Sequence, residues 1–168
     1  DGYTIAGISY RASDENDGLS PERALRTVAR AWALVSENCA DMIVLLHCAH
    51  TATASIAANV AGVTMMGLPR YSGGVVRPIT SLTISPSADI VTVTSTQIEI
   101  AWIHFIPITT MDSISATTAA TVHALHIHHC SFDLETAAAS TSTQGISITA
   151  TVQTYNYIHD CVFYCDAA

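Results

Sequence analysis

Two short segments combine histidine, cysteine and aromatic residues in a shared pattern. They are His126-Ile127-His128-His129-Cys130-Ser131-Phe132 and Tyr157-Ile158-His159-Asp160-Cys161-Val162-Phe163. On an extended strand His126 and His128 project from one face, and imidazole is a ligand that Zn²⁺ and related metals accept. The spacing is not that of a zinc finger. The sequence therefore favours no metal there, and a site at His126 and His128 is kept as the alternative.

The histidines also have a simpler, structural explanation. On stacked strands, His104, His128 and His159 would form an outward row along one face. Such a row would gain charge as the pH falls toward the ordinary imidazole pKa of about 6.5, and its like charges would loosen the stack. We expect a row that is mainly structural and that responds to acid.

Acidic side chains near the ends of predicted strands are the candidates for catalysis. Asp133 and Glu135 lie two residues apart, and Asp112, Asp160 and Asp166 fall near corresponding turns. Glycan hydrolysis uses a pair of carboxylates, so the candidate catalytic residues are Asp133, Glu135 and Asp160. Acids after a strand are ordinarily solvated turn residues, and no Lys or Arg occurs in the second half of the chain to serve a lyase. The sequence leaves enzymatic activity open and favours a non-catalytic role.

Aromatic side chains offer a second way to recognise a sugar. Trp102, Tyr155 and Tyr157 would form a stacking platform for a glycan if they faced outward, and Tyr164 would extend it. Core or subunit packing is the commoner role of such residues, above all for Trp102. They are the candidate glycan-binding residues.

Composition excludes several classes of function. The formal net charge is -8, with 6 Arg and no Lys, so a basic nucleic-acid-binding face is not expected. Apolar runs stop well short of the roughly 20 residues that cross a bilayer, so no membrane span is expected. No phosphate loop or nucleophile elbow occurs, and no cofactor is predicted. A neutral or cationic glycan stays compatible with this charge.

One helix and many short strands must position these side chains. Residues 1–19 form a polar N-terminal extension. Ser20, Pro21 and Glu22 are typical of a helix start, and apolar residues at offsets of three and four predict a helix over residues 20–38. Short extended segments follow from residue 42 onward, separated by turn-forming residues.

An imperfect internal repeat links the later strands. Aligning the segments at Trp102, His126 and Tyr157 places Ile103, Ile127 and Ile158 under one another. Their positions in the sequence differ by 24 (127 minus 103) and by 31 (158 minus 127). Such intervals are typical of a solenoid whose strands stack roughly 4.8 Å apart. Inward positions should then stack like on like, including Cys130 over Cys161.

Residues 1–70 resemble pectin-lyase-like right-handed parallel β-helix proteins. The resemblance lies in Asp17-Gly18-Leu19-Ser20-Pro21-Glu22, in Asp41-Met42-Ile43-Val44 and in Gly62-Val63-Thr64-Met65-Met66-Gly67, and the later Ile-His-x-Cys-x-Phe strands resemble the family's rungs. It implies an all-β solenoid: a single-stranded right-handed parallel β-helix over residues 20–168 with a capping α-helix (20–38). We expect further coils beyond residue 168.

Two functions follow from this resemblance and from the Ser, Thr and Ala content. The favoured one is a virion structural protein of a bacteriophage, as a tailspike, fibre or capsid-attached component that mediates assembly or attachment to a host-surface glycan. Its expected partners are sister subunits in a homotrimer and other virion proteins, and its expected location is the extracellular particle. The alternative is the N-terminal part of a polysaccharide-degrading β-helix enzyme.

Overall fold

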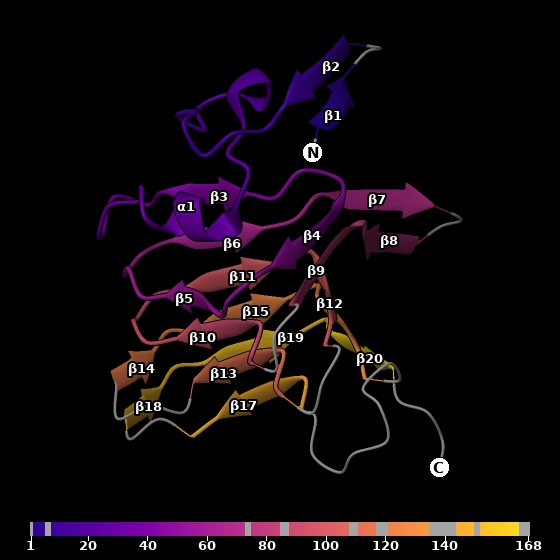
Figure 1. Ribbon diagram of the computed structural model, residues 1–168. Helices are drawn as coiled ribbons and strands as arrows, with labels where there is room; N and C mark the ends of the chain where they lie inside the picture. The colour runs from indigo at the N-terminus through magenta and orange to yellow at the C-terminus, as the bar shows by residue number, and fades with distance from the viewer. Residues whose placement is uncertain are drawn as a thin grey trace.

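The chain forms a stack of short strands with a small antiparallel hairpin at one end (Figure 1). The computed structural model describes residues 2–5, 8–72, 75–84, 88–107, 111–116, 121–134, 144–149 and 152–164. In the expected N-terminal extension, β1 (Gly2–Ile5) and β2 (Ile8–Arg11) pair as the hairpin. Within the described ranges, no helix is long and apolar enough to cross a membrane.

The helix predicted over residues 20–38 is wrong in its length. A 3₁₀ turn, η1 (Pro21–Arg23), begins where the sequence predicts a helix start, but the backbone returns to an extended conformation at Ala24. The α-helix α1 spans only Val28–Trp32. The predicted packing of its apolar face is confirmed, because Val28 and Trp32 are buried in the core and α1 contacts β5.

Asp14 explains the break between the two helical segments. Its carboxylate accepts hydrogen bonds from the backbone N–H groups of Arg26 and Thr27, at 3.0 and 2.8 Å, and from the Thr27 hydroxyl at 2.9 Å. Such side-chain bonds compete with helical bonds for the same donors. The helix therefore starts only after Thr27, whose hydroxyl accepts from the Arg30 N–H as an N-cap.

Three parallel sheets make up the stack (Figure 1). Sheet I contains β3 (Met42–Val44), β6 (Thr64–Met66), β11 (Glu99–Ala101), β15 (His126–His128) and β19 (Tyr157–His159). Sheet II contains β4 (Ala49–Ala52), β9 (Thr80–Ile84), β12 (Ile103–Ile106), β16 (Ser131–Asp133) and β20 (Val162–Tyr164). Sheet III contains β5 (Ile56–Ala58), β10 (Val91–Val93), β13 (Ile114–Ala116) and β17 (Ile146–Ile148).

The chain visits these sheets in a constant order. It runs through sheets I, II and III four times, and a fifth pass through sheets I and II follows. Each strand pairs in parallel with the strands of the same sheet from the passes before and after it. The all-β class with parallel pairing, predicted from the short apolar segments, is confirmed.

Like side chains stack inside the three sheets. Ile100, Ile127 and Ile158 share one register on sheet I, and Phe105, Phe132 and Phe163 share another on sheet II. The stacked rings of Phe105 and Phe132 have centroids 5.2 Å apart, and those of Phe132 and Phe163 are 4.8 Å apart. The predicted stacking is confirmed for Ile127 and Ile158, whereas the places of Ile100 and Phe105 in these columns were not predicted. Cys161 packs against the core that contains Cys130.

The repeat predicted from Ile103 is wrong by three residues. Ile100, not Ile103, pairs with Ile127, so the first interval in the sequence is 27 (127 minus 100), while the second stays 31 (158 minus 127). The alignment failed because a corner at Trp102, where φ is 58°, interrupts the strand between the two isoleucines.

Residues with positive φ form the corners between sheets I and II. Trp102, His129 and Asp160 have φ of 58°, 54° and 52°, and they occupy equivalent positions in successive passes. Their backbones are linked, because the N–H of Trp102 donates to the His128 carbonyl and that of His129 donates to the His159 carbonyl. The corner lets both Ile127 and Cys130 face inward, which strict alternation would forbid.

Small elements are inserted at the turns between sheets. An antiparallel hairpin, β7 (Pro69–Ser72) and β8 (Val75–Pro78), projects to the side between β6 and β9 (Figure 1). A two-stranded parallel sheet pairs β14 (Thr121–His123) with β18 (Val152–Thr154) ahead of sheet I. The register of the main sheets continues across both insertions.

Candidate functional site

A groove lies over the corner between sheets I and II, beside the β7–β8 hairpin. We call it the corner groove; its volume is about 710 Å³, and its lining includes Arg77, Trp102, His129, Asp133, Asp160 and Tyr164. The hairpin supplies Arg77, the corners supply Trp102, His129 and Asp160, and sheet II supplies the other two side chains. Charged, aromatic and imidazole side chains thus meet in one hollow.

Two of the three candidate catalytic acids line the corner groove. Asp133 lies at the end of β16, and Asp160 lies at the next corner. A hydrogen bond from His159 to Asp160, with donor and acceptor 2.7 Å apart, is the main cause that lowers the pKa of this carboxyl. Asp160 is therefore ionised at neutral pH, which suits a base or a cation ligand rather than a general acid.

Of the other acidic candidates, the structure describes Asp112, which does not line the corner groove. Asp112 belongs to the turn before β13, where its carboxylate accepts from the backbone N–H of Gln144 at 3.1 Å. Glu135 and Asp166 lie outside the described residues. The structure thus brings Asp133 and Asp160 to one surface and leaves Asp112 elsewhere.

The aromatic candidates are divided between two surfaces. Trp102 lines the corner groove and stacks on His129, with ring centroids 4.1 Å apart. Tyr155 and Tyr157 are 79% and 62% exposed, but neither lines the groove. Tyr164, in contrast, is a groove residue next to His104, with ring centroids 6.3 Å apart. A sugar platform in the groove would use Trp102 and Tyr164.

The predicted row of His104, His128 and His159 is wrong in one member. His128 and His159 are in register and stack with centroids 5.2 Å apart. Ala101 occupies the corresponding position one strand earlier, whereas His104 lies on sheet II and contacts the Ser131 hydroxyl at 2.7 Å. The correction has the same origin as the shifted repeat, namely the corner at Trp102.

The outer face of sheet I instead carries a cluster of imidazoles around a carboxylate. Nε2 of His128 lies 2.8 Å from Oε1 of Glu99, and Nδ1 of His126 lies 3.9 Å from the same oxygen. Hydrogen bonding to His128 is the main cause that lowers the pKa of Glu99, while burial and the neighbouring His128 lower that of His126. These groups are suited to hold a cation.

Glu99 was missed by the sequence interpretation, although a signal for it exists. It pairs directly with His126 on the neighbouring strand, so aligning the repeat on Ile100 would have placed the acid beside the imidazoles. The alignment on Ile103 put Trp102 there instead. A register error of three residues therefore concealed the carboxylate.

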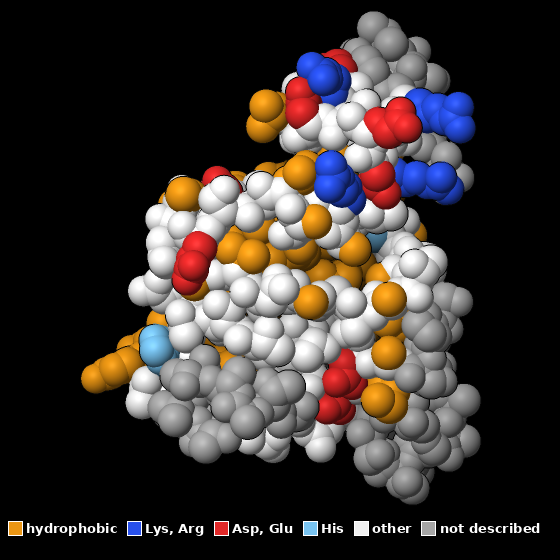
Figure 2. Space-filling model, turned by 60° about the vertical axis from the view of Figure 1, so that its left-hand side comes forward, with side chains coloured by type: hydrophobic (Ala, Val, Ile, Leu, Met, Phe, Trp, Pro, Cys, Tyr) orange, Lys and Arg blue, Asp and Glu red, His pale blue; other side chains and the backbone are white. Residues whose placement is uncertain are grey.

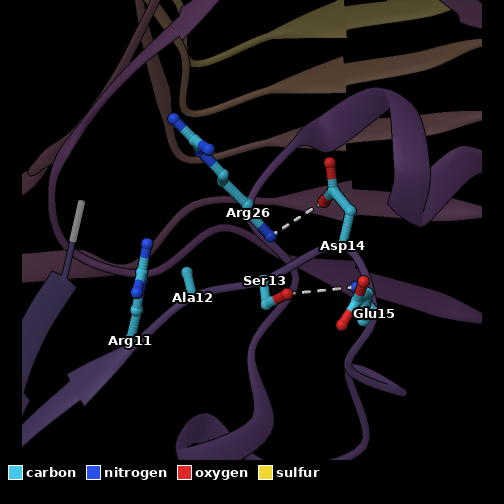
Figure 3. A pocket seen from close by; sticks show the side chains of 6 residues that line it. All are labelled: Arg11, Ala12, Ser13, Asp14, Glu15 and Arg26. Carbon is cyan, nitrogen blue, oxygen red and sulfur yellow. Dashed lines mark hydrogen bonds between the residues drawn. The ribbon is translucent and has the colours of Figure 1, made fainter.

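A second hollow lies at the junction between the N-terminal hairpin and the stack (Figure 3). Arg11, Ser13, Asp14 and Arg26 are among its lining residues, and its volume is about 460 Å³. The Asp14 carboxylate is occupied by the backbone bonds that break the predicted helix. We assign this hollow a structural role.

Charge is distributed unevenly over the surface. Figure 2 shows the basic side chains gathered at the end of the molecule that carries the N-terminal extension, with acidic side chains among them, while the visible face of the stack is largely apolar or neutral apart from separate acidic side chains. Four of the six arginines fall within residues 11–30. The stack therefore presents a weakly charged face to its surroundings.

Comparisons with known proteins give no match: no family model, no curated protein and no solved structure matches this chain. The function must therefore be argued from the described geometry.

Proposed function

We propose that the chain is a right-handed parallel β-helix that serves as a structural and attachment component of a bacteriophage particle. The constant order of the three parallel sheets supports the β-helix, because a chain that returns to the same sheet once per pass winds around a common core. Right-handedness is supported by the strong preference of parallel crossover connections for that hand. In the particle the chain would form a homotrimer and contact other virion proteins.

The corner groove is the observation that carries the attachment role. Glycan sites combine aromatic faces with a few polar groups, and the groove has Trp102 and Tyr164 together with Asp133, Asp160 and Arg77. The groove is built on stacked strands and linked corners, which hold such groups in fixed positions. We infer that it binds a glycan of the host surface.

Sugar binding can be tested by comparing aromatic residues inside and outside the groove. The purified chain is applied to an array of bacterial surface polysaccharides, together with Trp102→Ala, Arg77→Gln and the control Tyr157→Ala. We expect binding to fall at least about tenfold in the groove variants, because losing a stacked ring or a charged hydrogen bond removes more than about 1.4 kcal/mol. The control should bind like the unmodified chain. Absence of binding by the unmodified chain, or equal binding by all variants, would contradict the proposal.

The proposed homotrimer can be tested separately by measuring the mass of the chain in solution. Light scattering coupled to size exclusion should give three times the 17.8 kDa chain mass. A cryo-EM map of the particle should then show faces of the stack meeting symmetry copies or neighbouring proteins over roughly 1,000 Å² or more. A monomer that stands free in the particle would contradict the structural role.

A glycan-cleaving activity is the second candidate, favoured by one observation. Asp133 and Asp160 line the same groove, as the two carboxylates of a glycosidase do. Release of reducing ends from a bound polysaccharide would identify this activity. Asp133→Asn and Asp160→Asn should then abolish release while binding persists, and a bound polysaccharide that stays intact would exclude it.

A further inference from the structure

Three side chains on the outer face of sheet I converge in a way that glycan binding does not require. Glu99 on β11 pairs in register with His126 on β15, and His128 projects from the same face two residues later. One ligand atom of each lies within 4.8 Å of the others. Two imidazoles and a carboxylate are a set that divalent transition metals accept.

The separations fit an ion after small movements. Tetrahedral zinc, with bonds of about 2.1 Å, holds its ligand atoms about 3.4 Å apart. The two separations from Oε1 of Glu99, 2.8 Å to His128 and 3.9 Å to His126, lie on either side of this value. On binding, each of these two separations would change by about half an ångström, and the separation between the two imidazole nitrogens, which is within 4.8 Å, would settle near the same value.

Proton positions around His126 point to a cation. Nδ1 of His159 lies 2.7 Å from the ionised Asp160 carboxylate, so a neutral His159 carries its proton there and accepts at Nε2. Nε2 of His126 is 2.8 Å from that acceptor and must donate to it. Nδ1 of His126 then carries a lone pair 3.9 Å from Oε1 of Glu99, and this lone pair is available to bind a cation shared with the carboxylate.

Each of the three side chains also has an outer partner that orients it. Oε2 of Glu99 accepts from the Thr64 hydroxyl at 2.9 Å. Nδ1 of His128 lies 2.7 Å from Nδ1 of His129, and Nε2 of His126 lies 2.8 Å from Nε2 of His159. Metal-bound imidazoles characteristically donate their second N–H to such a partner, and bound carboxylates are also hydrogen-bonded.

We propose that Glu99, His126 and His128 bind one divalent transition metal of the zinc class on the outer face of sheet I. The carboxylate comes from the third pass and both imidazoles come from the fourth, so the ion connects two neighbouring strands. In the bound state His128 is neutral: Nε2 has released any proton to the solvent, and the one remaining ring proton is on Nδ1, which donates to Nδ1 of His129. Three protein ligands leave one position of a tetrahedral ion open to water. The site shares the orienting residues His129 and Asp160 with the corner groove, but it requires neither a bound glycan nor the particle.

The proposal can be tested by zinc titration calorimetry on the purified chain after chelation and desalting. Exposed Cys39 and Cys48 are thiols that zinc also accepts, so a Cys39→Ser, Cys48→Ser background is used throughout. This background should bind one equivalent of Zn²⁺. Glu99→Gln, His126→Gln and His128→Gln should each weaken binding at least about tenfold, and the matched control His123→Gln should leave it unchanged.

Thr64→Val adds a variant that leaves all three ligands in place. It removes the hydroxyl that orients Glu99, and we expect it to weaken zinc binding about 10- to 100-fold. Far-UV circular dichroism checks that every variant is folded; if a histidine variant unfolds, Glu99→Gln and Thr64→Val decide the question. The proposal is overturned if the background chain binds no zinc, or if folded ligand variants bind it as tightly as His123→Gln.

Discussion

The inner and outer faces of sheet I come from the same strands but follow different rules. The inner face repeats unbranched or β-branched aliphatic side chains, with Met65, Ile100, Ile127 and Ile158 in register. The outer face presents Glu99, His126 and Tyr157 at one register and Ala101, His128 and His159 at another. Packing constrains the inner positions to similar shapes, whereas the outer positions are free to vary. The stack thus sets the spacing of outer side chains without choosing their chemistry.

The largest expected effect is on the inner face. Phe132 is fully buried between two stacked phenylalanines, so Phe132→Ala should lower the free energy of unfolding by about 3–5 kcal/mol. Phe163→Ala is the matched control, because Phe163 is 46% exposed and should cost clearly less. Urea unfolding measures both. Equal losses would mean that the two positions are equally enclosed in solution.

The corners between sheets I and II should be the next most sensitive positions. A Cβ added at Gly67 would lie against the carbonyl oxygen of Trp102 and near the Thr80 side chain. Because backbone atoms would have to move, Gly67→Ala should destabilise the fold by about 1–3 kcal/mol. At Gly18 a Cβ would meet only the flexible Leu25 side chain, so the strain of an alanine there would come from the positive φ of +71° rather than from a backbone clash. Thermal unfolding of Gly67→Ala without a loss of stability would mean that this corner is looser in solution than in the structure.

Acid should weaken the stack through histidines on its outer surface. Burial lowers the pKa of His104 and, with help from His128, that of His126. Near pH 6 the unfolded chain then binds more protons than the folded one, so stability falls as the pH drops below about 6.5. Burial raises the pKa of Asp112 from 3.8, which acts in the opposite sense at lower pH.

Urea unfolding at pH 7 and at pH 5.5 measures this dependence. His104→Gln should reduce the difference between the two pH values, since it removes one of the two groups. A stability that is constant or higher at pH 5.5 would contradict the expected loss in acid.

The smallest expected change in stability comes from a substitution on the outer face of sheet I when no metal is present. His128→Gln removes the contact between Nε2 of His128 and the Glu99 carboxylate, which is only partly shielded from water. In the presence of a chelator, this loss should lower the free energy of unfolding by less than about 1 kcal/mol. Added zinc should then stabilise the original chain but not this variant. If His128→Gln, measured with a chelator present, lowers the free energy of unfolding as much as Phe132→Ala does, the outer cluster is part of the structural core.

The predictable part of the fold is the part that repeats. The recurring Ile and Phe positions predicted stacked parallel strands, and the inner columns follow them. The packing of α1 on the core was also predicted, because Val28 and Trp32 share an apolar face. The length of the helix was not predicted, because the Asp14 carboxylate accepts hydrogen bonds from the backbone N–H groups of Arg26 and Thr27, which are 12 and 13 positions later in the sequence. Helical periodicity contains no information on such a competitor.

Individual residues of the candidate sites were predicted, but their arrangement was not, because it too depends on contacts between distant parts of the sequence. Asp133, Asp160 and Trp102 were identified one by one, and their meeting in one groove depends on corners with positive φ at non-glycine residues. Asp and His are enriched at positive φ, but both also occur widely elsewhere, and Trp102 has no such preference, so these residue types mark the corners only weakly. Arg77 reaches the groove from an inserted hairpin, although the lack of Lys and Arg in the second half of the chain argues against basic groups near the acids.

The β7–β8 hairpin has a consequence for how this molecule could diversify. It enters and leaves between two strands whose pairing with their neighbours continues undisturbed, and it forms one wall of the corner groove. An exchange of this hairpin would therefore alter the groove without shifting the register of the core. Under the proposed glycan-binding role, replacing this hairpin would change which glycan the groove prefers, while the strand pairing of the scaffold stays the same.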